Sequence, residues 1–174
     1  MRNDDVLQVK VFSDKMGKAQ RVQSLFEWFR ETDQVFEKYN IPCILSVLSE
    51  GIEVYPEWVS YIKNNLHRFQ IELHGFQHDF YNDMSAEEGY RNLKQAREEI
   101  EDTFNIKITT WYVPFGKKKF PVWGKEVCDK LGIDFDVTGN NKGNQRYFHY
   151  WYKKNQDSIC KLLEGICHPQ FVSS

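Results

Sequence analysis

Apolar residues recur at two spacings along the chain, and the two spacings alternate. Residues 20–39 carry apolar side chains three and four positions apart, as on one face of a helix. The run Asn-Ile-Pro at 40–42 ends this segment, because proline cannot continue a helix. Residues 43–47 then form a continuous apolar run, which is typical of a buried strand.

The same alternation continues along the rest of the chain. A helix is predicted over 57–65, with Pro56 near its start, and a strand over 69–73. The clearest helix begins after Ser85, which forms a capping box with Glu88 ahead of an apolar face that extends to residue 104. The other predicted elements are strands over 7–12, 108–113, 133–137 and 165–167, and a helix over 122–131.

Strands that alternate with helices favour a parallel sheet with crossover connections. We predict an α/β fold: a compact, incomplete or distorted (β/α) barrel with a mainly parallel sheet, in preference to a doubly wound sheet. The 174 residues are too few for a full eight-unit barrel of about 250 residues and suggest a single domain over 1–174. In either architecture, functional side chains belong at the C-terminal ends of the strands.

Composition limits the partners of the protein. The net charge is -2, from 23 Lys and Arg against 25 Asp and Glu, which gives no basic footprint for nucleic acid. No apolar run approaches the ~20 residues of a membrane span. The first residues are polar and acidic, unlike a signal peptide. We therefore expect a soluble, cytoplasmic protein whose cysteines are free thiols; the sequence does not indicate an oligomeric state.

Two histidines directly follow the predicted strand 69–73. Residues 74–78 read His-Gly-Phe-Gln-His, which places His74 at the strand end and His78 in the next loop, with Gly75 allowing a sharp turn between them. Two imidazoles at this spacing can converge on one metal ion, although two polar histidines beside a turn would give the same pattern. The zincin helix motif is excluded, because Gly75 stands where that motif needs glutamate.

Two adjacent carboxylates, Asp4 and Asp5, stand in the opening run Arg-Asn-Asp-Asp-Val. Adjacent carboxylates repel each other in a closed site, and a cation would remove that cost. One aspartate could then bind a metal while the other acts as a base; the alternative is a frayed acidic terminus. Asp14, after the predicted strand 7–12, is a rival metal ligand, but adjacent carboxylates favour Asp5.

Two more motifs follow predicted strands. Residues 111–116 read Trp-Tyr-Val-Pro-Phe-Gly, a turn that could form one wall of a cleft or serve only as a structural turn. Residues 166–169 read Ile-Cys-His-Pro, so His168 follows a short apolar run, as a structural histidine could also do. The order of the four motifs is more informative than any one of them.

This order resembles the polysaccharide deacetylase (NodB-homology) family, and the resemblance covers residues 2–170. The Arg-Asn-Asp-Asp-Val opening is similar to a divergent branch, in place of the Thr-Phe-Asp-Asp-Gly of central members. The resemblance implies an incomplete or distorted barrel that uses one divalent metal ion, expected to be zinc, to remove N-acetyl groups from glycans.

The resemblance also implies a role for each motif. Asp4 matches the general base, and Asp5 matches a metal ligand. His74 and His78 match the two histidine ligands. His168 matches the late histidine that acts as general acid.

The third motif matches in part. Phe115 takes the aromatic place, where a backbone amide helps to hold the oxyanion, and Tyr112 and Pro114 stand beside it as substrate or oxyanion residues. Tyr112 occupies a position where the family usually has arginine. The fourth motif, an aspartate near a tryptophan, has no match, because Asp136 and Trp151 do not have the expected spacing.

These assignments predict a metal-dependent hydrolase that acts on the amide bond of an acetylated amino sugar or glycan. Three alternatives stay open: a catalytically degenerate metal- or glycan-binding protein of the same fold, a hydrolase of another amide or ester, and a helical interaction protein without a site. An Asp-His-His set suits zinc and would also accept iron, cobalt, nickel or manganese.

Overall fold

The computed structural model describes residues 2–9, 18–115 and 120–136, with the backbone alone for 2–5 and 18–25. All of these residues belong to one compact unit, Met1–Gly139. The predicted strand 165–167 lies outside them, and the single domain over 1–174 stays a prediction. No helix in the described part of the chain has the length and apolar character needed to cross a membrane.

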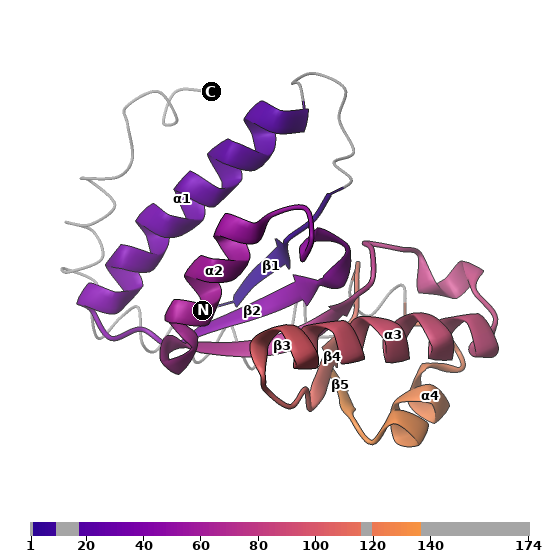
Figure 1. The fold of residues 1–174 in the computed structure, drawn as a ribbon. Helices are drawn as coiled ribbons and strands as arrows, with labels where there is room; N and C mark the ends of the chain where they lie inside the picture. The colour runs from indigo at the N-terminus through magenta and orange to yellow at the C-terminus, as the bar shows by residue number, and fades with distance from the viewer. Residues whose placement is uncertain (1, 10–17, 116–119, 137–174) are drawn as a thin grey trace, which may run out of the picture. The chain divides into compact units, whose positions relative to one another are not determined.

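Five parallel strands form one sheet, and their order in the sheet is their order in the chain (Figure 1). The strands are β1 (Arg2–Val6), β2 (Cys43–Leu48), β3 (Phe69–Gly75), β4 (Thr110–Tyr112) and β5 (Asp134–Asp136). A doubly wound sheet reverses its strand order at a switch point, whereas this order runs in one direction, as in the wall of a barrel. The predicted α/β fold with a parallel, incomplete barrel is confirmed.

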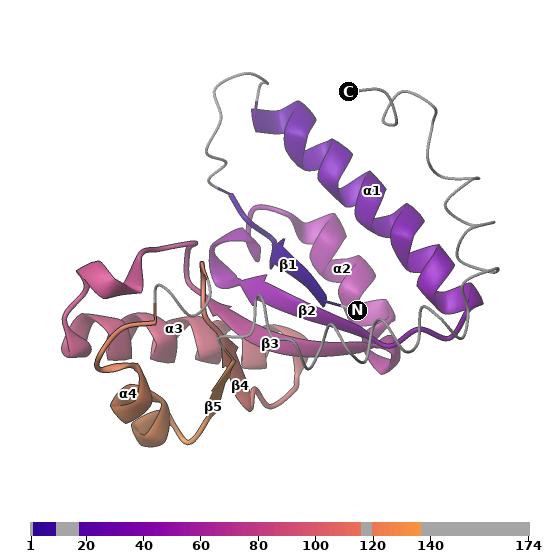
Figure 2. The same cartoon turned by 180° about the vertical axis from the view of Figure 1, so that it is seen from behind.

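Helices connect the strands and cover one side of the sheet. The α-helices are α1 (Lys18–Lys38), α2 (Pro56–Asn64), α3 (Ala86–Phe104) and α4 (Gly124–Leu131), and the 3-10 helices are η1 (Ser49–Gly51), η2 (Leu66–Arg68) and η3 (Tyr81–Asp83). Helices α2 and α3 stand in front of the strands in Figure 1 and behind them in Figure 2. Right-handed crossovers produce this arrangement, because successive connections in one direction stay on the same side.

Alternate residues along β3 separate an apolar core from a buried polar face. Phe69, Ile71 and Leu73 belong to the core that the strands share with the helices. Glu72 and His74 occupy the alternate positions, so they point to the opposite side of the sheet. Both are buried, with 4% and 1% of their surface exposed. His74 therefore lies on the face that a barrel encloses.

The first strand is the element that the sequence predicts wrongly. The apolar pattern places a strand over 7–12, but β1 is Arg2–Val6 and Leu7 leaves it with a left-handed φ of 67°. Residues 7–9 are not in a strand, and residues 10–12 lie outside the described part of the chain. Strand β1 forms because pairing with β2 satisfies its backbone groups, which does not require an apolar run. Between residues 18 and 136, every predicted helix and strand is present, with small differences at the ends.

The capping box at the start of α3 is confirmed. Ser85 Oγ accepts a hydrogen bond from the Glu88 amide at 3.3 Å, and the Glu88 carboxylate accepts one from the Ser85 amide at 2.8 Å. The Ser85 hydroxyl also donates to the Glu88 carboxylate at 2.7 Å, and this bond, together with that from the Ser85 amide, lowers the pKa of Glu88. The same helix carries ion pairs one turn apart, Lys94 with Glu98 and Arg97 with Glu101.

Two of the four cysteines fall within the described residues. Cys43 and Cys128 are free, as predicted, and both are buried. Burial raises the pKa of Cys43 to about 11 and that of Cys128 to about 12, so both thiols stay protonated at neutral pH.

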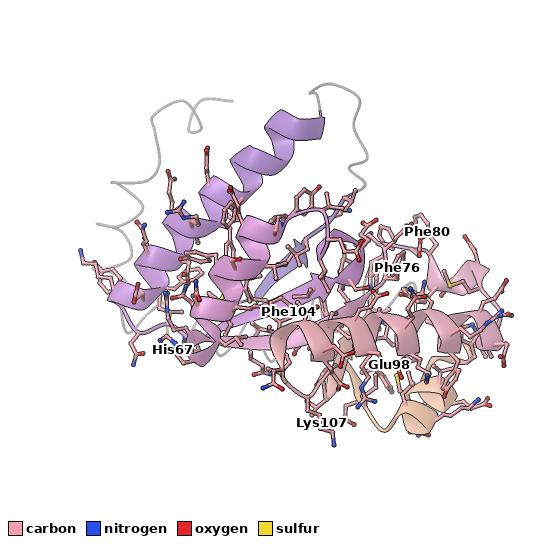
Figure 3. All side chains as sticks on the ribbon, viewed as in Figure 1. His67, Phe76, Phe80, Glu98, Phe104 and Lys107 are labelled. Atoms are coloured by element: carbon pink, nitrogen blue, oxygen red, sulfur yellow. The ribbon has the colours of Figure 1, made fainter. Side chains whose placement is uncertain are left out.

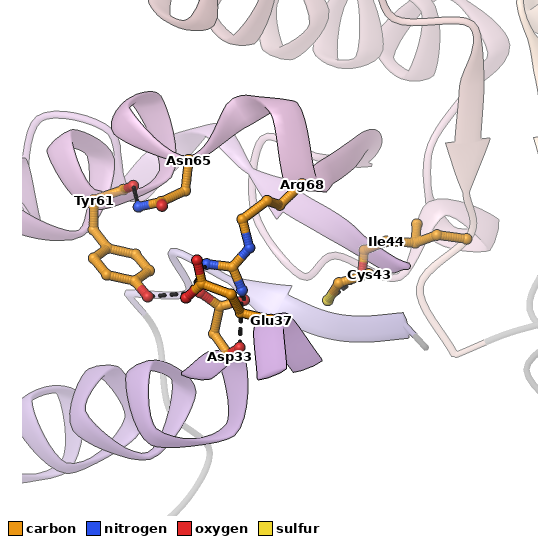
Figure 4. Close-up of polar contacts among 7 residues, drawn as sticks. All are labelled: Asp33, Glu37, Cys43, Ile44, Tyr61, Asn65 and Arg68. Atoms are coloured by element: carbon orange, nitrogen blue, oxygen red, sulfur yellow. Dashed lines mark hydrogen bonds and ion pairs between the residues drawn. The ribbon is translucent and has the colours of Figure 1, made fainter. Parts of the chain in front are cut away.

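A buried ion pair fastens α1 to the segment that enters β3 (Figure 4). The side chain of Asp33 is 1% exposed and accepts hydrogen bonds from Arg68 Nη2 and Tyr61 Oη, each at 2.6 Å. Arg68 also contacts the exposed carboxylate of Glu37 at 3.2 Å. Burial, together with the bond to Asp33, raises the pKa of Tyr61 to about 12. The carboxylate of Asp33 is thus enclosed by the groups that neutralise and solvate it.

Replacing Arg68 should therefore be costly. We expect Arg68→Met to lower the free energy of unfolding by about 3–5 kcal/mol, because Asp33 would keep a buried charge without its cation. Glu37→Gln is the matched control, because it removes the charge of the other carboxylate that contacts Arg68. The side chain of Glu37 is 61% exposed, so this variant should lower the free energy of unfolding by only about 0–1 kcal/mol. Urea unfolding of both variants measures the difference, and equal losses would contradict this account.

Candidate active site

His74 is buried near the end of β3, and one of its ring nitrogens bonds to the backbone. Its Nδ1 lies 2.7 Å from the carbonyl oxygen of Tyr112 in the neighbouring strand β4. A carbonyl oxygen can only accept, so Nδ1 carries the hydrogen and, in the neutral ring, Nε2 carries the lone pair. The Tyr112 ring stacks on the imidazole, with centroids 5.3 Å apart and planes 15° apart. This is the tautomer and the ring support typical of a metal-binding histidine.

His78 lies in the loop after β3 and faces His74. The two ring centroids are 5.1 Å apart, and His78 is partly buried. A metal–nitrogen bond of about 2 Å puts each ring centre about 3 Å from the ion, so two rings at a tetrahedral angle have centres about 5 Å apart. The separation of His74 and His78 fits two ligands of one ion.

Gly75 makes the turn between the two histidines. Its φ is 135°, a conformation that residues with a side chain rarely adopt. A Cβ at this position would overlap the hydroxyl of Tyr81, which is buried below the loop. The prediction that Gly75 allows a sharp backbone turn is confirmed, and the structure adds a second requirement, close packing.

Asn92 on α3 holds the same loop from outside. Its Oδ1 accepts a hydrogen bond from Tyr81 Oη at 2.7 Å and a longer one from the Phe76 amide at 3.4 Å. Burial raises the pKa of Tyr81 far above its usual range, so this hydroxyl keeps its proton and remains a donor. Sequence reasoning missed Asn92, since no local motif marks it.

Asp4 and Asp5 belong to a paired strand rather than a frayed terminus. In the parallel register, Asn3 pairs with Leu45 and Val6 with Val47, so β1 has two residues where β2 has one. This is a β-bulge, a feature found next to active sites because it changes the direction of the strand. The bulge lies in the last residues of β1, towards the same edge of the sheet as His74. The choice of Asp5 over Asp14, which is outside the described residues, stays a prediction.

The third motif lies beside the histidines. Tyr112 ends β4, and Pro114 and Phe115 follow it, with Pro114 buried. Phe115 has a left-handed φ of 61°, and its ring meets that of His78 edge to face at 4.3 Å. Strained backbone of this kind clusters at functional sites. The structure thus brings the third motif to the histidines, while its oxyanion role stays a prediction.

Phe80 is a neighbour that sequence reasoning missed. Its ring stacks on Phe115, with centroids 4.2 Å apart and planes 3° apart, and both side chains are 42% exposed. Figure 3 shows Phe76 and Phe80 at one end of the sheet and His67 at the other. The position of Phe80, two residues after His78, is the signal that could have indicated it.

Of the remaining candidate residues, the structure describes one. Asp136 ends β5 next to Tyr112 and accepts a backbone hydrogen bond from Val113 at 3.0 Å. His168 and Trp151 lie outside the described residues. Among the residues whose side chains are described, no three His, Cys, Asp or Glu form a group that could hold a metal ion. His74 and His78 could supply two ligands of a metal ion, and such a site would need a third.

The dual requirement for Gly75 gives a direct test. We expect Gly75→Ala to lower the free energy of unfolding by about 2–5 kcal/mol, from backbone strain plus overlap with Tyr81. Gly132→Ala is the matched control, since Gly132 also has a positive φ, 66°, but nothing lies near its Cβ position; it should cost about 1–2 kcal/mol. Denaturant unfolding compares the two, and an equal loss would show that the contact with Tyr81 contributes nothing.

Solved structures of known proteins share the fold of this chain. Wild-type BA3943 from Bacillus anthracis, described as a CE4 family pseudoenzyme, aligns with a TM-score of 0.57 and 14% identity over 63% of this chain and 38% of that one. Deacetylase PplD from Streptococcus pyogenes, in complex with acetate, aligns at 0.52 and 13% identity over 57% and 45%. Polysaccharide deacetylase Bc1974 from Bacillus cereus aligns at 0.52 and 12% identity over 61% and 51%.

The chain spans about two fifths of the length of BA3943, and at these identities the likeness shows the fold alone. No curated protein matches the sequence. The sequence profile described as polysaccharide deacetylase matches residues 24–135, well over half of the chain, and covers both histidines and the third motif. The chain belongs to the polysaccharide deacetylase family.

Proposed function

We propose that the protein is a metal-dependent hydrolase that removes N-acetyl groups from a carbohydrate. The observation that carries this proposal is the pair of histidines: His74, with Nδ1 bound to the Tyr112 carbonyl, and His78, 5.1 Å away. They lie at the C-terminal end of one parallel strand, β3, and barrel enzymes have their catalytic groups at such strand ends. Family membership supports the deacetylase class.

Asp5, His74 and His78 are the proposed ligands of one divalent ion, with zinc as the expected metal. The two rings fit a shared ion, and Asp5 stands in the bulge of β1, two strands from His74. Three protein ligands leave positions for water and substrate. When bound, such an ion lowers the pKa of its water and polarises the amide carbonyl.

The side chains of the protein would move the protons. Asp4 takes a proton from the attacking water, which adds to the carbonyl carbon of the acetamide. The backbone amide near Phe115 donates to the oxygen that becomes negative. The C–N bond then breaks, and His168 protonates the leaving amine. The products are acetate and a free amino sugar.

A specific observation favours a second candidate, a metal- or glycan-binding protein that has lost catalysis. Tyr112 stands where the family usually has the arginine that steadies the catalytic aspartate. Such a protein would bind metal without hydrolysing any acetylated amine. A hydrolase of another amide or ester would differ only in the substrate it accepts.

Metal content of the purified protein tests the site. We expect about one equivalent of zinc in the wild type and none in His74→Ala or His78→Ala, since each variant removes one of three ligands. His67→Ala is the matched control, because His67 is exposed at the opposite end of the sheet and should leave the metal in place (Figure 3). A wild type that stays metal-free after reconstitution would rule out the proposed mechanism.

Acetate release from an N-acetylglucosamine oligosaccharide tests the chemistry. Asp4→Asn should keep the metal and lose turnover, because an amide cannot accept the water proton. His168→Ala should slow turnover by about 10²–10⁴-fold, as is typical when an acid–base group is lost. Full metal occupancy with no acetate release in the wild type would favour the degenerate binder.

A further inference from the structure

The segment that follows β2 contacts both halves of the proposed site. Glu50, in η1, donates its backbone N–H to the carbonyl oxygen of Phe76 at 3.0 Å. Its carboxylate Oε1 accepts the backbone N–H of Val9 at 3.0 Å, across 41 residues of sequence. Phe76 lies between the two histidines, and Val9 lies just beyond the strand that carries the aspartates. One residue therefore connects the exit of β1 to the histidine loop.

Neighbours of Glu50 hold the exit of β1 in the same way. Gly51 packs directly against Leu7, where a Cβ would overlap the Leu7 carbonyl oxygen. The hydroxyl of Tyr55 lies 3.5 Å from the carbonyl oxygen of Gln8. Leu7 is fully buried and keeps its left-handed φ of 67°. A non-glycine residue persists in that conformation only where its surroundings require it, so the exit of β1 is closely constrained.

The peptide of Phe76 is held from two sides. Its carbonyl oxygen accepts from Glu50, and its N–H donates to Asn92. Helix α3 thus holds the histidine loop from the outer layer, and Glu50 connects the same loop to the exit of β1. Glu50 does not join His74 and His78 in any group of three potential metal ligands among the described side chains. Glu50 therefore acts on the site through the two backbone groups that it bonds, the Val9 N–H and the Phe76 carbonyl oxygen.

We infer that Glu50 is a positioning residue that sets the exit of β1 against the histidine loop, so that the carboxylate and imidazole ligands keep one geometry. The role of Glu50 in holding metal ligands rests on the proposed function. The connection between the exit of β1 and the histidine loop is present in the chain without metal. The bond to Val9 needs an acceptor oxygen at the end of the side chain, whereas the bond to Phe76 comes from the backbone N–H and is kept when the side chain is replaced. Glutamine supplies such an oxygen at the same reach, and alanine does not.

The experiment compares Glu50→Ala, Glu50→Gln and a control, Arg97→Gln. Arg97 bonds to Glu101 and to the carbonyl oxygen of Leu131, so its loss disturbs the packing of α3 without touching β1 or the loop. Two readouts are taken on the full chain. The first is hydrogen exchange of the backbone around Val9 and around residues 75–80 in the metal-free protein. The second is zinc affinity by chelator competition, with the visible spectrum of the Co²⁺-loaded protein.

We expect Glu50→Ala to speed exchange in both segments together, to weaken zinc binding by about 10–100-fold and to change the Co²⁺ spectrum. Glu50→Gln should stay close to the wild type in hydrogen exchange, zinc affinity and Co²⁺ spectrum. Arg97→Gln should lower the unfolding midpoint while leaving the site unchanged. Rescue by glutamine would separate positioning from charge and from general stability.

The inference would be overturned if Glu50→Ala exchanged like the wild type in the loop, if Glu50→Gln were no better than alanine, or if Arg97→Gln had the same effect on the site. A wild type that binds no metal would instead remove the proposed function. Coupled exchange at Val9 and the loop would still establish the link made by Glu50. The two failures are therefore distinguishable.

Discussion

Strand register is the constraint on which the whole site depends. Side chains alternate along β3, so Leu73 packs into the helix-covered core while His74, one residue later, turns to the opposite face. A slip of one residue would bury the histidine among apolar helices and expose the core leucine. The pairing of β3 with β2, from Cys43 with Phe69 onward, and the long apolar surface of α2 and α3 exclude that slip. The chemistry of the site is thus fixed by the same contacts that stabilise the fold.

Local sequence patterns predicted most helices and strands and the histidine loop. The features that these patterns missed depend on contacts between residues far apart in the sequence. The capping box at Ser85 and the glycine between the histidines are local rules, and both are confirmed. The strand Arg2–Val6 was missed because its residues are polar and its stability comes from β2. Asn92 and Glu50 reach the loop from other elements, so nothing near them in the sequence indicates their role.

Tyr112 illustrates how a site can depart from a family pattern and keep part of its geometry. The contact with His74 Nδ1 comes from its backbone carbonyl, which any residue in β4 would supply. Its side chain adds the stacked ring beside the imidazole, where an arginine would add a charge. The substitution therefore leaves the orientation of the histidine intact and removes a positive charge that the family usually places near the aspartate proposed here as the base. This is why metal binding and turnover are separate questions for this chain.

The capped helix α3 also has a consequence for the order of folding. Its capping box and its ion pairs one turn apart, such as Arg97 with Glu101, all join residues close in sequence, so they form without the closure of long loops. The link from Glu50 to Val9, by contrast, closes a loop of 41 residues. Helix α3 should thus reach its native form early, with Asn92 already in place to receive the histidine loop. The two halves of the site would be joined late, by the contacts that span the longest separations.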